Sequence, residues 1–538
     1  MHTMAMRGIL LAPQAHPRST PLTMPTAQAL SGRLLAIGLL GAANIATAQR
    51  PTPPLPPAVT RAMAAIREAD LKRDLFAMAA PGMRGREGGT LDEMRASIWV
   101  ADQYRALGLQ PAGDEGTWFQ WFDIVRTRVS TTASRATIAG QPMTLYRDAI
   151  PLNTAPLEAS GAVLWLPDPT DTTVDVRGRI VATQLRAPLP GSIRPYSYPA
   201  SARYATAAIA ATLPRLIRRG AAAILLVADP SVDSAFISLA VQRERGDYDV
   251  DRAVPRAAGA PDRVGPPVLG AGVTPAIMLR ASMATVLQSA ADASISIRLE
   301  RFETPSVNVI GVLRGKDPVL RNEYVLYSSH QDANGVRLLQ PNDSVLAGAD
   351  DNASVSVAEF GAARAFMAHK PKRSILFVHH GAEERGLLGS RYHAAHPVVP
   401  LAQIVAVLNG DMIGRNHPDT ATLLGTQPPH RSSAELVAMA LKANDATGRF
   451  VLDTLWDRPT HPEGWFFRSD HLPYARMGVP SLMYTTNLHD DYHTAGDIPE
   501  RIDYAKLTRM ARWMYMTGWY VADAPKRPAV DVGFRLER

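Results

Sequence analysis

The sequence predicts an α/β fold, with a mostly parallel central sheet flanked by helices and a β-rich domain inserted into it. From residue 305 onward, four apolar runs, EYVLYSS, SILFVHH, QIVAVLN and PSLMYTT, alternate with segments of helical spacing. Such runs are typical of parallel strands buried on both faces of a sheet. Between about 120 and 300, shorter apolar runs such as GAVLWLP and AAAILLVAD are separated by turns rich in Gly, Pro and Asp. A chain of 538 residues is also longer than one typical core, which favours a second domain.

Residues 1–48 are expected to be a secretory signal peptide. Arg33 precedes a short apolar stretch, and Ala46 and Ala48 give the A-x-A pattern of a cleavage site. The stretch is too short for a permanent membrane anchor, and no later segment reaches about 18 uninterrupted apolar residues. We therefore expect an exported protein, periplasmic or extracellular, with no stable membrane anchor. A start at Met24 would give a leader of ordinary length.

The segments after the leader follow in order. Residues 49–57 form a proline-rich linker, and 58–119 are the first part of the central domain. Helical apolar spacing follows the linker. A further helix is expected to start at a capping box made by Thr90 and Glu93 and to end at Gly108.

The rest of the chain divides into three parts. Residues 120–300 are expected to form the inserted domain, because their short strands interrupt the helical pattern on either side. Residues 301–525 complete the central domain, and 526–538 are a C-terminal tail.

Composition excludes several classes of function. Cysteine is absent, which excludes disulfides, thiolate metal ligands and a cysteine nucleophile. The formal charge is +7, but the arginines are scattered and no dense basic run with interleaved aromatics occurs, so no nucleic-acid partner is expected. The sequence gives no indication of oligomeric state.

Acidic residues and histidines gather where the buried runs end, the zone in which open α/β sheets bind ligands. They are His330 and Asp332 after EYVLYSS, Glu383 and Glu384 after SILFVHH, Asp411 after QIVAVLN, Asp350 and Asp351 before a helix, and His493 after PSLMYTT. Such a cluster of carboxylates would repel itself unless cations neutralised it. Imidazole with carboxylate oxygen suits zinc, cobalt or manganese, and hydrolytic sites often hold two such ions. Neighbouring residues at the end of an extended run point different ways, so one of the two glutamates can bind metal while the other acts as a base.

The motifs SSHQD, GADDNAS, GAEERGLLGS, NGDMIG, SDH with GVP, and YHTAGD occur in the order found in di-zinc aminopeptidases. The sequence resembles that family, which includes vacuolar aminopeptidase Y and secreted bacterial leucyl aminopeptidases, most strongly between about 305 and 515. The resemblance implies two zinc ions per chain and peptide substrates with a free N-terminus. It also implies the following roles: His330 and Asp411 on one zinc, Glu384 and His493 on the other, Asp350 bridging both, Glu383 as general base, and Asp332 orienting His330. The bond between Asp350 and Asp351 is implied to be cis.

The inserted segment has a resemblance of its own. The phrases VDVRGRIVATQL, GAAAILLVAD and TPAIMLRASMATVL resemble, in order and spacing, the protease-associated domain of several exopeptidase families. The segment GREGGT to GLQP resembles the N-terminal region of the aminopeptidases. Val355 stands where that family commonly has glycine, a difference expected to affect helix packing more than metal binding.

Other polar and aromatic residues have a simpler interpretation. His379, His380, His393, His396, His471 and His489 are expected to pack or to support the site indirectly, as is Asp470. The aromatic residues from Trp465 to Phe467 either line a side-chain pocket or pack in the core, which is the commoner fate of aromatics. Asp490 and Asp491 either face a substrate amine or lie solvated in a loop.

Three alternatives to an aminopeptidase remain open. A carboxypeptidase or dipeptidase of the same fold shares the metal cluster, but it would need arginines for a terminal carboxylate, and the sequence does not place Arg385, Arg415 or Arg468 there. A glutaminyl cyclase uses a single zinc, and the five ligand positions disfavour it. A receptor-like binding protein would have lost its ligands, whereas this sequence keeps them.

Overall fold

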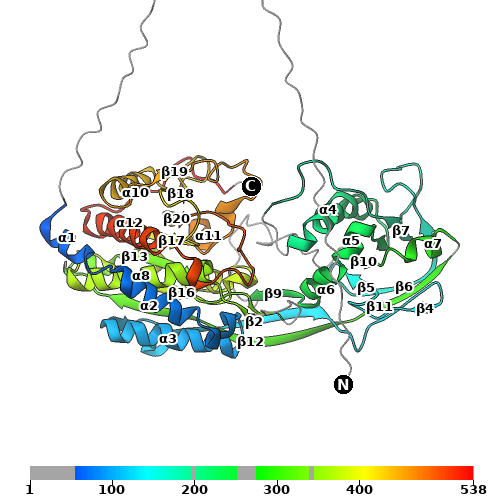
Figure 1. Cartoon of the computed structure of the whole chain (residues 1–538), viewed down its shortest axis with the longest axis horizontal. Helices are drawn as coiled ribbons and strands as arrows, with labels where there is room; N and C mark the ends of the chain where they lie inside the picture. The colour runs from blue at the N-terminus through cyan, green and yellow to red at the C-terminus, as the bar shows by residue number, and fades with distance from the viewer. Residues whose placement is uncertain (1–54, 196–199, 251–273, 290, 338–344, 537–538) are drawn as a thin grey trace, which may run out of the picture. The chain divides into compact units, whose positions relative to one another are not determined.

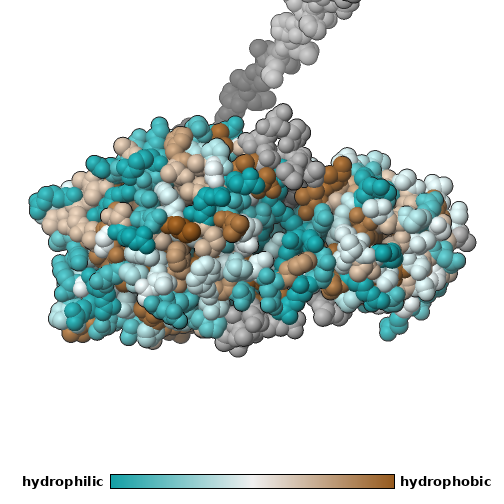
Figure 2. Space-filling model, turned by 90° about the horizontal axis from the view of Figure 1, so that it is seen from below, coloured by the Kyte–Doolittle hydropathy of each residue, from teal (hydrophilic) through white to brown (hydrophobic). Residues whose placement is uncertain are grey.

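The computed structural model describes residues 55–195, 200–250, 274–289, 291–337 and 345–536 (Figure 1). The expected signal peptide and most of the linker lie outside these residues. Within the described part of the chain, no helix is long and apolar enough to cross a membrane. On the face drawn in Figure 2, hydrophilic and hydrophobic residues are interspersed.

The larger sheet has ten strands, in the order β19-β18-β20-β17-β13-β16-β12-β2-β9, with β1 paired to β12. The strands are β1 (Gln110–Pro111), β2 (Phe119–Val129), β9 (Asp247–Val250), β12 (Leu299–Leu313), β13 (Tyr324–His330), β16 (Ser374–His380), β17 (Ile404–Gly410), β18 (Thr420–Leu424), β19 (Val451–Leu452) and β20 (Ser481–Thr485). The four central strands β16, β13, β17 and β20 are parallel, and every residue in them is buried. These are the four apolar runs of the sequence, so the predicted α/β fold with a parallel centre is confirmed. Antiparallel pairs such as β12 with β16 extend it into a mixed sheet.

Helices cover both faces of this sheet (Figure 1). They are α1 (Pro57–Met63), α2 (Glu68–Met78), α3 (Leu91–Leu107), α8 (Ser354–Ala368), α9 (Leu388–Ala395), α10 (Ala434–Ala446), α11 (His471–Arg476) and α12 (Tyr504–Asp523). Alternate residues of one strand point to opposite faces. Val325 and Tyr327 of β13 therefore pack with α3, α8 and α12, whereas Leu326 packs on the other side with Tyr474 of α11.

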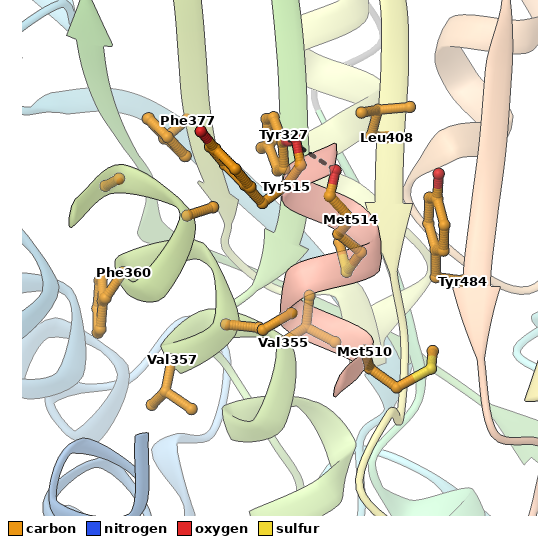
Figure 3. Close-up of a cluster of buried hydrophobic side chains, with 14 of the residues drawn as sticks. Tyr327, Val355, Val357, Phe360, Phe377, Leu408, Tyr484, Met510, Met514 and Tyr515 are labelled. Atoms are coloured by element: carbon orange, nitrogen blue, oxygen red, sulfur yellow. Dashed lines mark hydrogen bonds between the residues drawn. The ribbon is translucent and has the colours of Figure 1, made fainter. Parts of the chain in front are cut away.

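The hydrophobic core between β13, α8 and α12 holds these three elements together. The Tyr327 hydroxyl donates to the backbone oxygen of Met514 at 2.8 Å (Figure 3). Val355 packs there too, and a Cβ at Gly410 would lie only 2.5 Å from its side chain. The valine at this position thus affects helix packing against the end of β17, which leads into Asp411.

A second sheet has eight strands, in the order β4-β3-β11-β6-β7-β8-β10-β5. They are β3 (Arg135–Ile138), β4 (Gln141–Pro142), β5 (Ala149–Pro151), β6 (Leu157–Trp165), β7 (Ile180–Gln184), β8 (Ala223–Val227), β10 (Ala276–Leu279) and β11 (Asp292–Ile297), with helices α4 (Arg203–Arg218), α5 (Pro230–Ser234), α6 (Phe236–Glu244) and α7 (Met283–Gln288). All of these elements fall inside 120–300. Strand β9 falls there too but pairs with β2 in the larger sheet. The likeness of this segment to a protease-associated domain stays a prediction.

The start of α3 differs from the expected capping box. Thr90 caps the helix by accepting from the Asp92 amide at 3.2 Å, and Gly108 ends it in the left-handed region, as expected. Glu93 does not reach back to Thr90. It is fully buried and accepts from the Gly89 amide at 2.7 Å. Its other contacts belong to the site described next.

A small two-stranded sheet completes the described elements. It pairs β14 (Gly335–Val336) with β15 (Val345–Leu346).

Candidate metal centre

Four loops at the carboxyl edge of the parallel strands bring the expected residues together. His330 ends β13, Asp411 follows β17, and a short helical turn, Glu383–Arg385, follows β16. An irregular turn, Ala349–Ala353, precedes α8, and His493 lies in the loop after β20. This is the edge at which α/β sheets bind ligands, because the strands all end there.

Two groups of side chains are each compact enough to hold a cation. His330, Glu383 and Asp411 offer ligand atoms that all lie within 4.8 Å of one another, and all three are buried. Asp351, Glu384 and His493 form the second group by the same measure.

Asp351 belongs to the second group and also faces His330 of the first group. Its Oδ1 is 3.3 Å from Nε2 of His330, and its Oδ2 is 3.1 Å from Nε2 of His493. The same nitrogen of His493 is 3.1 Å from Oε2 of Glu384. One carboxylate therefore faces both imidazoles with its two oxygens, the arrangement that a bridging ligand needs.

Asp350 is not in this position, and the expectation that it lies between the two groups is wrong. Its Oδ1 accepts from the Gly414 amide at 2.6 Å, and its Oδ2 lies 3.4 Å from Nε2 of His489. The cis peptide bond likewise links Asp351 to Asn352, one residue later than expected. The physical reason is that the chain is not regular between Gly348 and Ser354, so no helix or strand period decides which aspartate points inward.

Asp332 supports the turn that carries both glutamates. Its Oδ1 accepts from the Glu383 amide at 2.9 Å, and its Oδ2 accepts from the Glu384 amide at 3.2 Å. The same Oδ1 lies 3.5 Å from Nδ1 of His330, while the Asp332 carbonyl oxygen lies 3.1 Å from that nitrogen. Asp332 thus adjoins the imidazole, as expected, and also holds the backbone of Glu383 and Glu384.

Glu93 adds a second carboxylate beneath the same turn, which the sequence did not predict. Its Oε1 accepts from the Ala382 amide at 3.0 Å, and the Ser306 hydroxyl donates to it at 2.9 Å. Burial raises the pKa of Glu93 to about 8, and the negative charge of Asp332 adds to the shift. The only signal in the sequence was the T-x-x-E pattern, which indicated a helix cap.

Backbone strain gathers around the centre. Ala382, Met412 and His493 adopt φ of 51°, 54° and 56°, in the left-handed region that non-glycine residues seldom enter. Ala382 precedes Glu383, and Met412 follows Asp411. Such conformations persist where surrounding contacts fix them, and they are commonest at functional sites.

The pKa shifts and the buried polar atoms of the two groups indicate sites for cations. Burial raises the pKa of Glu383 and of Asp411 well above the usual range. Burial opposes ionisation of His493, yet the charges of Glu384 and Asp351 raise the pKa of this histidine to about 9. Within the described residues, Nε2 of His330 and Oε1 of Glu384 are buried without a hydrogen-bond partner. A buried set of carboxylates with unsatisfied atoms fits divalent cations, and the mixture of His nitrogen and carboxylate oxygen fits zinc.

The other histidines lie outside both groups. His379 and His393 are buried, and burial lowers the pKa of each to about 3. His379 is 3.3 Å from a carboxylate oxygen of Glu359, and Nδ1 of His393 is 2.6 Å from the Tyr474 hydroxyl. Burial raises the pKa of Asp470 to about 7, whereas the charge of a nearby His330 lowers it.

The aromatic residues Trp465, Phe466 and Phe467 are buried in a cluster with Met412. The ring of Tyr492 stacks on His493 with centroids 3.7 Å apart, a contact that the sequence did not indicate.

Asp491 is paired with two arginines, Arg415 at 2.6 Å and Arg501, and does not lie free in a loop.

A small pocket adjoins the second group. Its lining includes Asn334, Leu346, Asp351, Glu384, His493 and Thr494.

Comparison with protein families identifies the segment that carries this centre. Residues 308–517 match the profile of Peptidase family M28. They include all the residues of both groups, but Glu93 lies outside them.

Sequence relatives match over the same region. A probable zinc metalloprotease from Pyrenophora tritici-repentis is 24% identical over 265 residues, which cover 42% of this chain and 59% of the relative. Leucine aminopeptidase 1 from Penicillium rubens is 26% identical over 242 residues, covering 42% of this chain and 60% of that protein. The chain thus spans about three fifths of the length of these relatives.

Solved structures match over most of the chain. The aminopeptidase from Aneurinibacillus sp. strain AM-1 superimposes with a TM-score of 0.53 at 15% identity, covering 88% of this chain and 98% of its own. The zinc aminopeptidase BSAP from Bacillus subtilis gives 0.52 at 17% identity, covering 87% and 99%. At these identities the likeness shows a shared fold.

Proposed function

Since residues 308–517 match the profile of Peptidase family M28, we propose that this chain is a zinc-dependent exopeptidase, and specifically an aminopeptidase acting on peptides with a free N-terminus. The observation that carries the proposal is the position of Asp351, whose two oxygens face two separate imidazoles. The aminopeptidase activity in the names of the matched relative and structures supports the choice of peptide end.

Two zinc ions per chain are proposed. His330 and Asp411 would hold one ion, Glu384 and His493 would hold the other, and Asp351 would bridge them in place of Asp350. Glu383 lies in the first group, with its Oε2 3.8 Å from Nε2 of His330. We assign it to the proton and not to the metal, because a hydrolytic site needs one carboxylate that stays free to exchange protons.

In the proposed reaction, Glu383 takes a proton from the attacking water and returns it to the leaving nitrogen of the peptide bond. Bound zinc would supply Lewis acidity, lowering the pKa of water and polarising the scissile carbonyl. Burial raises the pKa of Glu383 above that of an exposed glutamate, the direction that suits a group that both accepts and donates a proton. Asp332 and Glu93 hold the backbone on which Glu383 stands.

Export is also part of the proposal. It is supported by the leader-like pattern of residues 1–48.

The test combines metal analysis with substrate specificity. Purified protein is analysed for metal by mass spectrometry and assayed on aminoacyl anilides and their N-acetylated counterparts. Near two zinc ions per chain, with cleavage of the free-amine substrates only, is the expected result. Two metals with cleavage from the carboxyl end would instead favour a carboxypeptidase, and a protein without metal would contradict the enzyme assignment.

A further inference from the structure

Three arginines from separate parts of the chain surround one carboxylate next to the metal centre. Arg245 precedes β9, Arg337 directly follows β14, and Arg385 immediately follows Glu384. The shared carboxylate belongs to Glu87, which lies in the segment before α3. We call Arg245, Arg337 and Arg385 the arginine cluster.

The pairing within this cluster is uneven. Arg245 Nη2 lies 3.4 Å from Oε1 of Glu87, and a nitrogen of Arg385 contacts that same oxygen. Arg337 Nη1 lies 3.5 Å from the other oxygen, Oε2. One carboxylate oxygen therefore serves two guanidinium groups, each of which can donate several hydrogen bonds.

Two further observations concern the polar atoms and charges of Arg385 and Arg245. The Nε atom of Arg385 is buried and has no hydrogen-bond partner among the described residues, on a side chain that is 6% exposed. Burial lowers the pKa of Arg245 to about 10, and the positive charges of Arg385 and Arg337 contribute to that decrease. Arg385 therefore keeps one buried donor that an additional acceptor could satisfy, beside a second guanidinium that shares the same Glu87 oxygen.

The cluster adjoins the proposed site of reaction. Arg337 Nη2 lies 3.3 Å from Oδ1 of Asn334, and Asn334 lines the same small pocket as Asp351 and Glu384. Arg385 is the next residue after Glu384, and consecutive Cα atoms are about 3.8 Å apart. Burial lowers the pKa of Arg385, but the charges of Glu87, Glu384 and Asp332 outweigh it and raise the pKa above the usual value.

We propose that the arginine cluster binds a carboxylate of the peptide substrate, so that the enzyme prefers short peptides carrying a negative charge next to the scissile bond. This inference rests on the proposed function. Guanidinium groups bind carboxylates through paired, charge-assisted hydrogen bonds. Glu87 already accepts some of these contacts from the three arginines. The Tyr248 ring lies against Arg385, with the guanidinium 5.2 Å from the ring centroid, and so limits the directions in which this side chain can turn. The carboxylate is either the C-terminus of a dipeptide or an acidic side chain, and the test separates the two.

The experiment compares Arg245→Gln with the wild-type full chain. Arg245 is chosen because it is remote in sequence from every proposed ligand and 23% exposed. The matched control is Arg301→Gln, which removes an exposed arginine that pairs with Glu303 on β12. The substrates are leucyl p-nitroanilide, the dipeptide Leu-Ala, its amide, and Leu-Asp amide.

Loss of one charge-assisted contact corresponds to roughly a tenfold change in kcat/KM. Wild type and Arg301→Gln should prefer Leu-Ala to its amide by about tenfold or more, if the C-terminus is the ligand. Arg245→Gln should lose that preference while keeping its kcat/KM on the anilide. Preference for Leu-Asp amide over Leu-Ala amide, lost in the same variant, would instead identify an acidic side chain.

Equal kcat/KM in the wild type for Leu-Ala, its amide and Leu-Asp amide would overturn the inference and leave the aminopeptidase proposal intact. Preferences unchanged in Arg245→Gln would overturn it as well. If Arg245→Gln does not fold, Arg245→Lys keeps the charge without the paired geometry, and it should retain only part of the preference. No cleavage of any substrate by metal-loaded wild type would overturn both proposals together.

Discussion

Asp332→Asn tests how far the catalytic turn depends on its buried support. Asp332 accepts two backbone N–H groups, those of Glu383 and Glu384, one on each oxygen. Asparagine has the same shape but offers one oxygen and one NH2 group. One of the two amides must therefore lose its acceptor and face another donor.

The magnitude follows from those contacts. A hydrogen bond to a charged acceptor contributes about 1.5–3 kcal/mol, and a buried donor left without a partner costs about 1–3 kcal/mol more. The Asp332 side chain is fully buried, so water cannot replace the lost acceptor. We expect a loss of about 3 kcal/mol in unfolding free energy, or a shift of the turn that lowers turnover by roughly 10- to 100-fold, as is usual when the support of a metal site is altered.

The assay measures urea unfolding, metal content and kcat/KM on an aminoacyl anilide. The matched control is Asp457→Asn, because Asp457 is also a buried aspartate that holds a turn, accepting from the amides of Gly425 at 2.7 Å and Thr426 at 2.8 Å. The control should lose stability and keep its kcat/KM. An Asp332→Asn protein with wild-type stability and wild-type turnover would refute the reasoning, because neither amide would then have needed the carboxylate.

Three other outcomes are expected. Glu383→Gln should keep its metal content and lose at least about 100-fold in kcat, since the variant has no group to carry the proton; near-normal turnover would remove the assignment. Asp351→Asn should lose metal, whereas Asp350→Asn should keep more of it, as measured by mass spectrometry after dialysis; the reverse order would restore Asp350 as the bridge. Glu93 has a folded-state pKa of about 8 against 4.5 when unfolded, so its contribution to stability is present below pH 4.5 and is lost as pH rises to 8. Metal-free Glu93→Gln should therefore gain stability relative to metal-free wild type between pH 5 and 8.5 in urea titrations, and a difference independent of pH would contradict the raised pKa.

The sequence predicted the central strands of the fold because a strand that is buried on both faces is a continuous apolar run in the sequence. The run SILFVHH became β16 and EYVLYSS became β13, with every residue of both strands buried. The pairing of β9 with β2 has no comparable signal in the sequence. Asp247–Val250 is a half-polar strand whose partner lies more than 100 residues earlier, and alternation alone does not select a partner at that distance.

The sequence indicated which types of residue form the metal centre, but it did not distinguish between two adjacent aspartates. His330 ends a strand, Glu384, Asp411 and His493 each follow one, and the structure brings all four to one edge of the sheet. The error of one residue at Asp350 has a different origin. Two adjacent aspartates in an irregular turn are equivalent by composition, and only the three-dimensional path of the chain distinguishes them.

Glu93 shows why part of such a centre stays hidden in the sequence. A left-handed Ala382 turns its N–H toward Glu93, while the next two N–H groups meet Asp332, so three consecutive amides are held by two buried carboxylates. An acceptor for a strained turn is required physically, since a buried N–H without a partner is costly. Nothing requires the acceptor to be near in sequence, and Glu93 lies 289 positions before Ala382. The position of Glu383 therefore depends on the first turn of α3, a segment outside the region that matches the peptidase family.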